Sequence, residues 1–207
     1  FNHSGSAHPW IDNLPSSDWL NFNGDYHQTN YRLSTLTDPY ASDYDRKISV
    51  DGWFVKEMPD LNQRNPHLMK YLVQNSIWWI EESQIDGIRM DTYPYADKDA
   101  MAAWIDAVKR EYPDFNIVGE CWFGDVAGVG RWQGGSALSK AAGDTNLPTV
   151  MDFPFMIKSA DLAPYKEDTD PWNGLNKLYD HFALDYVYAD PLKVLRFLDN
   201  HDTERVI

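Results

Sequence analysis

Residues 85–91, Ile-Asp-Gly-Ile-Arg-Met-Asp, are a short apolar run that ends on a carboxylate, and we expect them to form a buried strand. Before this run, Asn65 followed by Pro66 predicts the start of a helix that continues to about residue 84. After it, Asp97 predicts the start of a second helix, which ends before Pro113. A buried strand between two helices is typical of an α/β fold with a parallel sheet.

The same alternation continues toward residue 207. A glycine-rich loop at 124–135 lacks the spacing of a phosphate-binding loop, which disfavours a nucleotide site. Residues 4–50 have no regular period, so we expect a functional loop region or a small subdomain there. The other expected elements are strands at 115–120, 149–152 and 192–199 and a helix near 172–187.

Composition excludes several classes of protein. The 207 residues are 43% hydrophobic and 14% aromatic, which is enough for a sizeable core and excludes a disordered chain. The net charge of −14 excludes binding to nucleic acid by neutralising phosphates and argues against docking on an anionic membrane. No apolar run is long enough for membrane insertion, and Cys121 has no second cysteine for a disulfide.

Three acidic residues follow three of the predicted strands: Asp91, Glu120 and Asp202. The carboxyl ends of parallel strands meet at one edge of a sheet, where α/β proteins build their sites. A single carboxylate there is often a helix cap, but capping is a poor explanation for all three. Arg89 is two residues before Asp91 on the same strand, so the two side chains share a face and the guanidinium keeps the carboxylate ionised.

The surroundings of Glu120 are different, because Cys121 and Trp122 follow it. An apolar and aromatic surround favours the protonated form of a carboxylic acid. One ionised and one protonated carboxyl group are the arrangement used in glycoside hydrolysis. The acidic, aromatic-rich composition also suits a neutral substrate rich in hydroxyl groups.

Taken together, these segments resemble the motifs of the α-amylase family, glycoside hydrolase family 13. Residues 86–91 resemble the family's strand-4 motif, Gly-Glu-Cys-Trp at 119–122 its strand-5 motif, and Phe-Leu-Asp-Asn-His-Asp at 197–202 its strand-7 motif. Asn2-His3 is similar to the end of the strand-3 motif, and Met-Pro-Asp-Leu-Asn at 58–62 to the extra motif near the end of domain B. The main motifs occur in the family's order over the whole chain.

The resemblance implies a segment of a (β/α)8 TIM barrel, roughly from the end of strand 3 to strand 7, with a domain B excursion after strand 3. Residues 1–3 would then be the end of strand 3, residues 4–62 the domain B-like region, and residues 63–207 the barrel strands and helices. A complete barrel takes about 250 residues. We therefore expect the parent chain to extend before Phe1 and after Ile207, and the activity of these residues alone is left open.

The resemblance also implies a retaining, double-displacement mechanism, in which the two catalytic carboxyl groups lie about 5–5.5 Å apart. Asp91 would be the nucleophile, Glu120 the acid/base, and Asp202 would stabilise the transition state. Arg89 would orient Asp91. The remaining residues assigned to substrate binding are His3, His201, Trp122 and Tyr95.

Two departures from the family's common forms bear on specificity. The motif at 58–62 lies between the neopullulanase and oligo-1,6-glucosidase forms, which indicates mixed α-1,4 and α-1,6 preference. Tyr95 stands where typical α-amylases carry His, although it could also be plain loop packing. The expected enzyme is a neopullulanase-like or cyclomaltodextrinase-like starch-degrading hydrolase that acts on maltooligosaccharides, cyclodextrins or pullulan. A transglycosylase with the same residues and a non-catalytic carbohydrate-binding relative are the alternatives.

No cofactor is needed for this chemistry. The resemblance leaves a structural calcium ion open, with Asn2 as one ligand, because oxygen-only ligation suits calcium. No signal peptide is visible in these residues. We nevertheless favour a periplasmic or extracellular location over a cytoplasmic one. The expected partner is an α-glucan, and the oligomeric state is left open.

Overall fold

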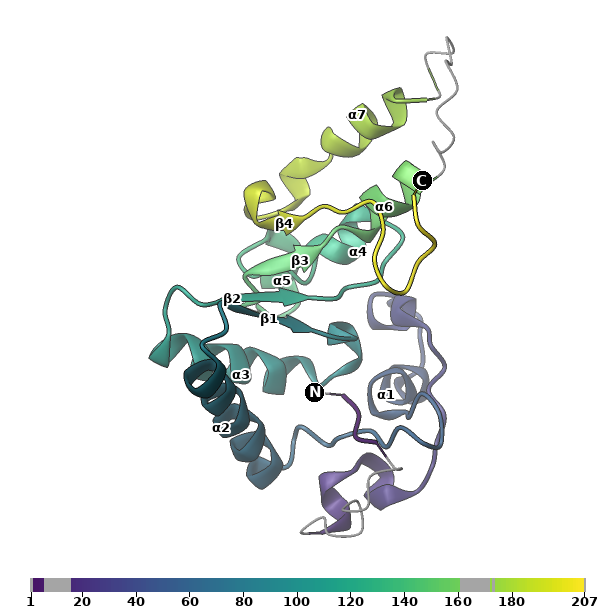
Figure 1. The fold of residues 1–207 in the computed structure, drawn as a ribbon. Coiled ribbons are helices and arrows are strands. Elements are labelled where there is room, and N and C mark those ends of the chain that lie inside the picture. Colours follow the sequence, from purple (N-terminus) through teal and green to yellow (C-terminus); the bar gives the residue numbers. More distant parts are fainter. Residues whose placement is uncertain (1, 6–15, 161–171, 173, 207) are drawn as a thin grey trace. The chain divides into compact units, whose positions relative to one another are not determined.

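The computed structural model describes residues 2–5, 16–160, 172 and 174–206 (Figure 1). Residues 6–15 of the predicted domain B-like region therefore lie outside the described residues, as do residues 161–171 and residue 173 of the expected helix at 172–187. The chain divides into two compact units, Phe1–Ile117 and Val118–Ile207.

Four short strands carry the α/β pattern: β1 (Gly87–Met90), β2 (Asn116–Gly119), β3 (Thr149–Met151) and β4 (Val194–Leu195). Their order in the sheet is β1-β2-β3-β4, the order of the sequence. β3 pairs in parallel with β2 and with β4, with Val118 opposite Thr149 and Val150 opposite Val194. Helices stand between consecutive strands, as the sequence predicts for a parallel sheet.

Among the residues described in the first unit, three α-helices form: α1 (Asp43–Asp51), α2 (Pro66–Ser83) and α3 (Lys98–Glu111). α2 begins as predicted, because Asn65 Oδ1 accepts hydrogen bonds from the backbone N–H groups of His67 and Leu68. Asp97 caps α3 in the same way through Ala100 N–H. These two caps depend only on neighbouring residues, which explains why the sequence alone located them.

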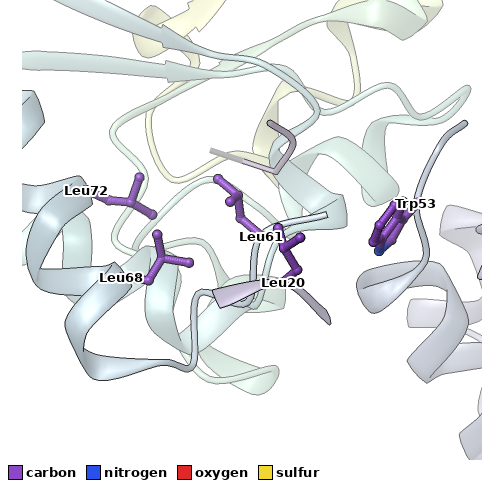
Figure 2. Close-up of a cluster of buried hydrophobic side chains, with 5 residues drawn as sticks. All are labelled: Leu20, Trp53, Leu61, Leu68 and Leu72. Atoms are coloured by element: carbon purple, nitrogen blue, oxygen red, sulfur yellow. The ribbon is translucent and has the colours of Figure 1, made fainter. Parts of the chain in front are cut away.

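The irregular region packs onto α2 through a small apolar core (Figure 2). Leu68 and Leu72 lie one turn apart on the buried face of α2. They belong to a buried cluster that also contains residues from the predicted domain B-like region, namely Leu20, Trp53 and Leu61. The face of α2 that these leucines occupy is therefore used to hold the irregular region in place.

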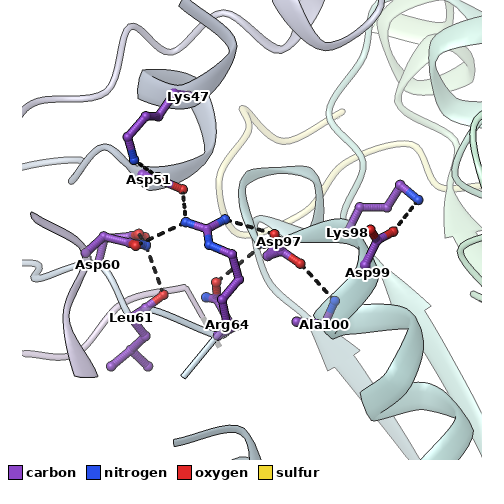
Figure 3. Close-up of polar contacts among 11 residues, drawn as sticks. Lys47, Asp51, Asp60, Leu61, Arg64, Asp97, Lys98, Asp99 and Ala100 are labelled. Carbon is purple, nitrogen blue, oxygen red and sulfur yellow. Dashed lines mark hydrogen bonds and ion pairs between the residues drawn. The ribbon is translucent and has the colours of Figure 1, made fainter. Parts of the chain in front are cut away.

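A polar cluster around Arg64 makes a second connection between the irregular region and the helices (Figure 3). The guanidinium Nη1 donates to Asp97 Oδ2 at 2.8 Å, and Nη2 donates to Asn21 Oδ1 at 3.2 Å and to Asp51. Asn21 Nδ2 in turn donates to Asp60 Oδ2 at 2.6 Å. Arg64 thus joins the end of α1, the segment at Asn21 and the cap of α3.

The described part of the second unit contains four α-helices: α4 (Val126–Gly130), α5 (Ala137–Ala141), α6 (Phe153–Ala160) and α7 (Asn176–Phe182). Two glycines of the segment 124–135 pack closely against other parts of the unit, and one of them, Gly130, ends α4. A Cβ added at Gly134 would lie 2.8 Å from Asn146 Cα, and one at Gly130 would lie 2.8 Å from Val187 Cγ1. These two glycines therefore allow a close approach that a side chain would prevent.

Several elements differ from the sequence predictions. The expected strand at 192–199 is only β4, because Asp190 and Pro191 start a 3-10 helix, Pro191–Lys193, directly before it. α1, α4, α5 and α6 were not predicted, and α4 lies within the segment 124–135 that was expected to be a loop. Local caps mark two of them: the Ser42 hydroxyl caps α1, and Asp152 Oδ1 accepts from Phe155 N–H in the first turn of α6. The helix near 172–187 is shorter, as α7 followed by a 3-10 turn at Asp185–Val187.

None of the described helices is both long enough and apolar enough to cross a membrane.

Candidate active site

Asp91 directly follows β1, and its carboxylate is exposed. The Arg89 guanidinium Nη1 donates to Asp91 Oδ1 at 2.8 Å, as expected for residues two apart on one strand. The Asp91 side chain is 61% exposed and that of Arg89 31%. Asp91 is therefore an accessible, ion-paired carboxylate at a strand end, with the properties required of a nucleophile.

The backbone after Asp91 is strained. Thr92 has φ 46° and ψ 36°, a left-handed conformation that is unfavourable for a β-branched residue. Asn2 Nδ2 donates to both Thr92 O at 2.6 Å and Thr92 Oγ1 at 2.7 Å. Asn2 thus ties the amino-terminal segment to the turn that follows Asp91. Strained residues held by such contacts are frequent at functional sites.

His3 lies in an aromatic group with Phe54 and Tyr95. The ring centroids of His3 and Phe54 are 4.3 Å apart, and Tyr95 meets Phe54 edge-on at 4.9 Å. Burial lowers the pKa of His3 to about 4, and the negative charge of Asp91 partly opposes this. His3 is therefore neutral near pH 7, and the effect of the Asp91 charge on its pKa indicates that the two side chains lie near each other. Phe54 was not among the predicted residues, because no sequence motif marks it.

Glu120 directly follows β2, and at 4% exposure it is buried. Its neighbours Ile117 and Cys121 are fully buried. Burial, with the charge of Glu120 as a smaller cause, raises the pKa of the Cys121 thiol well above its ordinary value. Cys121 is therefore an inert, buried thiol beside a buried carboxyl group.

Trp122 stacks on Phe153. The ring centroids are 4.5 Å apart with an interplanar angle of 18°, and Phe153 meets Phe197 edge-on at 5.1 Å. Phe153 is fully buried, whereas Trp122 is 43% exposed. One face of the indole is thus covered by a buried ring while the residue remains accessible. Such an aromatic surface can stack against the apolar face of a sugar ring.

The segment after β4 carries His201 and Asp202. His201 Nε2 lies 3.1 Å from Asp202 Oδ2, and both side chains are exposed. Earlier in the same segment, Asp199 accepts hydrogen bonds from Val206 N–H and from the Arg205 guanidinium, and these bonds lower the pKa of Asp199. These bonds join Asp199 to Arg205 and Val206 and so stabilise the turn that contains His201 and Asp202.

Asn2 provides one feature that fits a cation. Its Oδ1 atom is buried and accepts no hydrogen bond, which leaves an oxygen available to a hard cation such as calcium. Asp60 is also buried, but desolvation raises the pKa of its carboxyl group to about 8. Within the described ranges, no three His, Cys, Asp or Glu side chains gather to hold a metal. In the described part of the chain, Asn2 Oδ1 is thus a candidate oxygen ligand that has no acidic cluster beside it.

The structure gathers the expected residues into two groups. The first unit contributes Asn2, His3, Arg89, Asp91 and Tyr95. Asn2 contacts Thr92, Arg89 contacts Asp91, and the rings of His3 and Tyr95 both contact Phe54. The second unit contributes the residues that follow β2 and β4, namely Glu120, Trp122, His201 and Asp202. The expected separation of about 5–5.5 Å joins residues of different units and stays a prediction, as do the roles of these residues.

Comparison with known protein families matches residues 1–207 to the family described as "Alpha amylase, catalytic domain". The "Intracellular maltogenic amylase" of Bacillus subtilis (strain 168) is 28% identical over 209 residues, covering 100% of this chain and 31% of that protein. A "Cyclomaltodextrinase" of Geobacillus thermopakistaniensis (strain MAS1) is also 28% identical, with 100% and 32% covered. The chain thus spans about a third of the length of these relatives.

Solved structures show the same likeness. An α-amylase crystal structure from Anoxybacillus has a TM-score of 0.72 and 27% identity, covering 99% of this chain and 39% of that one. The α-amylase of Geobacillus thermoleovorans complexed with acarbose has the same TM-score and identity, with 97% and 38% covered. The expected fold class, a segment of a (β/α)8 barrel, is confirmed. The word "Intracellular" in the name of one relative does not favour the periplasmic or extracellular location expected from the sequence.

Proposed function

Because the chain belongs to the family of α-amylase catalytic domains, we propose that the full-length protein is a retaining α-glucan hydrolase with Asp91 as nucleophile and Glu120 as acid/base. The observation that carries the proposal is the family match over residues 1–207, with a carboxylate directly after each of β1 and β2. The exposed, Arg89-paired Asp91 suits a nucleophile, and the buried Glu120 suits a proton donor.

In the proposed reaction, an Asp91 oxygen attacks the anomeric carbon while Glu120 donates its proton to the leaving glycosidic oxygen. The covalent glycosyl-enzyme is then hydrolysed by a water that Glu120 deprotonates, so the α configuration is retained. Arg89 orients the attacking carboxylate through its 2.8 Å contact. Asp202 and the adjacent His201 bind sugar hydroxyls, and His3 offers a neutral imidazole for the same purpose. The chemistry needs no cofactor.

The proposed substrates are maltooligosaccharides, cyclodextrins and pullulan, cleaved at α-1,4 and α-1,6 bonds. The names of the maltogenic amylase and cyclomaltodextrinase relatives support this class. Hydrolysis and transglycosylation use the same residues and differ in whether water or a sugar reacts with the glycosyl-enzyme. Product analysis on pullulan, separating panose from maltotriose, determines the bond that is cleaved and shows any transfer products. Cellulose and chitin should remain untouched.

A structural calcium ion remains part of the proposal, with Asn2 Oδ1 as one oxygen ligand. Calcium added after treatment with a chelator should then raise the melting temperature of the full-length protein. The Asn2→Ala variant should lose this response. An unchanged melting temperature on removing and restoring calcium would contradict a calcium site at Asn2.

The roles of Asp91 and Glu120 are tested with a glycosyl fluoride, whose leaving group needs no proton. Asp91→Ala should form no glycosyl-enzyme. Glu120→Ala should form it and then stall, because no base activates water. Azide should restart the Glu120→Ala variant and yield the α-glycosyl azide, with retention.

Azide supplied to Asp91→Ala should instead occupy the space of the missing carboxylate, attack the substrate directly and give the β-glycosyl azide. The two products are distinguished by NMR. The opposite stereochemistry in the two variants would exchange the assigned roles, and wild-type rates in both would refute the site.

A further inference from the structure

The indole of Trp122 is held by a ring that is itself fully buried. Phe153 covers one indole face at a centroid distance of 4.5 Å and an angle of 18°, while Phe197 closes on Phe153 edge-on at 85°. Met151 and Met156 belong to the same buried cluster, with Val118 packed against it. Close packing of Phe153 and its neighbours therefore supports one face of the indole and limits the orientations that the indole can adopt.

The three rings come from three consecutive strand ends of the second unit. Trp122 lies three residues after β2, Phe153 is the second residue after β3, and Phe197 is the second residue after β4. The carboxyl ends of parallel strands are where α/β proteins bind their ligands. The stack thus lies at the binding edge of β2, β3 and β4, although no sequence motif includes Phe153.

A buried polar network fixes the residues that precede the two phenylalanines. Asp152, next to Phe153, binds His181 Nε2 at 2.9 Å and the Nε of Arg196, next to Phe197, at 3.2 Å. The Arg196 guanidinium also donates to Asp185. Asp152 N–H donates to Leu195 O at 2.9 Å, and Asp152 Oδ1 accepts from Phe155 N–H. These contacts tie β3 to β4 at the positions from which the supporting rings project.

We propose that Phe153 is a positioning residue for substrate specificity, which holds the Trp122 indole so that its accessible face stacks on one glucose ring of an α-glucan. This inference rests on the proposed function. Sugar rings present apolar C–H faces, and an aromatic ring fixed in advance loses little conformational entropy when it binds one. Phe153 acts through Trp122 and makes no substrate contact itself.

The test uses the full-length protein and maltohexaose. Phe153→Leu keeps an apolar side chain but removes the stacking ring, and Phe155→Leu is the matched control. Phe155 lies on the same helix and packs against His181 and Phe182, at 5.7 and 5.8 Å between ring centroids. We expect Phe153→Leu to weaken maltohexaose binding by about 3- to 10-fold, the usual range for losing one aromatic contact. Phe155→Leu should have a smaller effect.

A purely structural role of Phe153 is tested by repeating the maltohexaose binding measurement in a Trp122→Ala background. Phe153→Leu should then have no further effect on maltohexaose binding, because the indole that it positions is gone. In protein labelled with 5-fluorotryptophan, the Trp122 resonance, assigned from Trp122→Phe, should shift in Phe153→Leu and not in Phe155→Leu. If Phe153→Leu does not fold, Phe197→Leu, which removes the edge-on ring, replaces it in both measurements.

Binding is measured by calorimetry in an Asp91→Asn background, so that the result does not depend on turnover. If the unaltered protein fails to hydrolyse maltohexaose but binding follows the expected pattern, the proposed function fails and the inference stands. If hydrolysis occurs but Phe153→Leu weakens binding equally with and without Trp122, the inference is overturned. Absence of maltohexaose binding, or an unchanged Trp122 resonance in Phe153→Leu, also overturns it.

Discussion

Asp91 and Glu120 each follow a strand directly, yet one side chain is 61% exposed and the other residue only 4%. β1 is the first strand in the sheet order, whereas β2 lies between β1 and β3. Glu120 is followed by the fully buried Cys121, and Asp91 by the strained Thr92. The same sequence pattern, a strand that ends on a carboxylate, thus produces two different environments. The packing around each strand end decides which carboxylate is exposed.

The largest expected effects come from replacing each of the two carboxylates with alanine. Both Asp91→Ala and Glu120→Ala should lower kcat on maltooligosaccharides by at least about 100-fold, as expected for a lost nucleophile or general acid. Glu120→Ala should also lower the free energy of unfolding by about 1–3 kcal/mol, because it empties a buried position. Asp91→Ala should change it by less than about 1 kcal/mol. Denaturant titrations measure this contrast, and equal losses of stability would contradict it.

Asp60 extends the comparison to a buried carboxyl group outside the predicted catalytic set. Its pKa is raised to about 8, chiefly by desolvation, so the native protein keeps this proton while the unfolded chain loses it near pH 4. The stabilising effect of protonation is complete below about pH 4 and is lost as the pH rises toward 8. The Asp60→Asn variant cannot titrate, so its stability relative to the unaltered protein should increase from pH 5 to pH 8.

Unfolding of both proteins at several pH values measures this effect. Asp25→Asn, which changes an exposed side chain in the same unit, is the control and should show no such trend. A pH-independent difference for Asp60→Asn would show that Asp60 is ionised in the native protein.

The smallest expected effect concerns the turn after Asp91. Asn2 donates two hydrogen bonds to Thr92, and each is worth about 1 kcal/mol net. Asn2→Ala should therefore lower the free energy of unfolding by about 1–2 kcal/mol and reduce kcat, because Thr92 would no longer hold Asp91 in place. A double-mutant cycle with Thr92→Ala isolates the hydroxyl contact, with an expected coupling of about 0.5–1.5 kcal/mol. Additive effects would indicate that this contact is unimportant, and Thr92→Ser, which retains the hydroxyl, serves as the control.

Elements marked by local signals were predicted well from the sequence. The caps at Asn65 and Asp97, the parallel α/β pattern and the contact between Arg89 and Asp91 all depend on residues close together in the chain. The motifs also identified the family, which the match over residues 1–207 confirms. The length of the strand at 192–199 was wrong, because the turn at Asp190 and Pro191 takes up its first residues. α6 was missed, although Asp152 and Pro154 are ordinary signals for a helix start.

The sequence by itself therefore determined the family, the fold class and the carboxylates at the strand ends, because period, caps and motifs are properties of neighbouring residues. Only the tertiary structure decided that Glu120 is buried and Asp91 exposed, that Asn2 holds the strained Thr92, and that Phe153 supports Trp122. Asn2 and Thr92 are 90 positions apart in the chain, and Trp122 and Phe153 are 31 apart. Such contacts arise from packing between distant segments, so no local pattern encodes them.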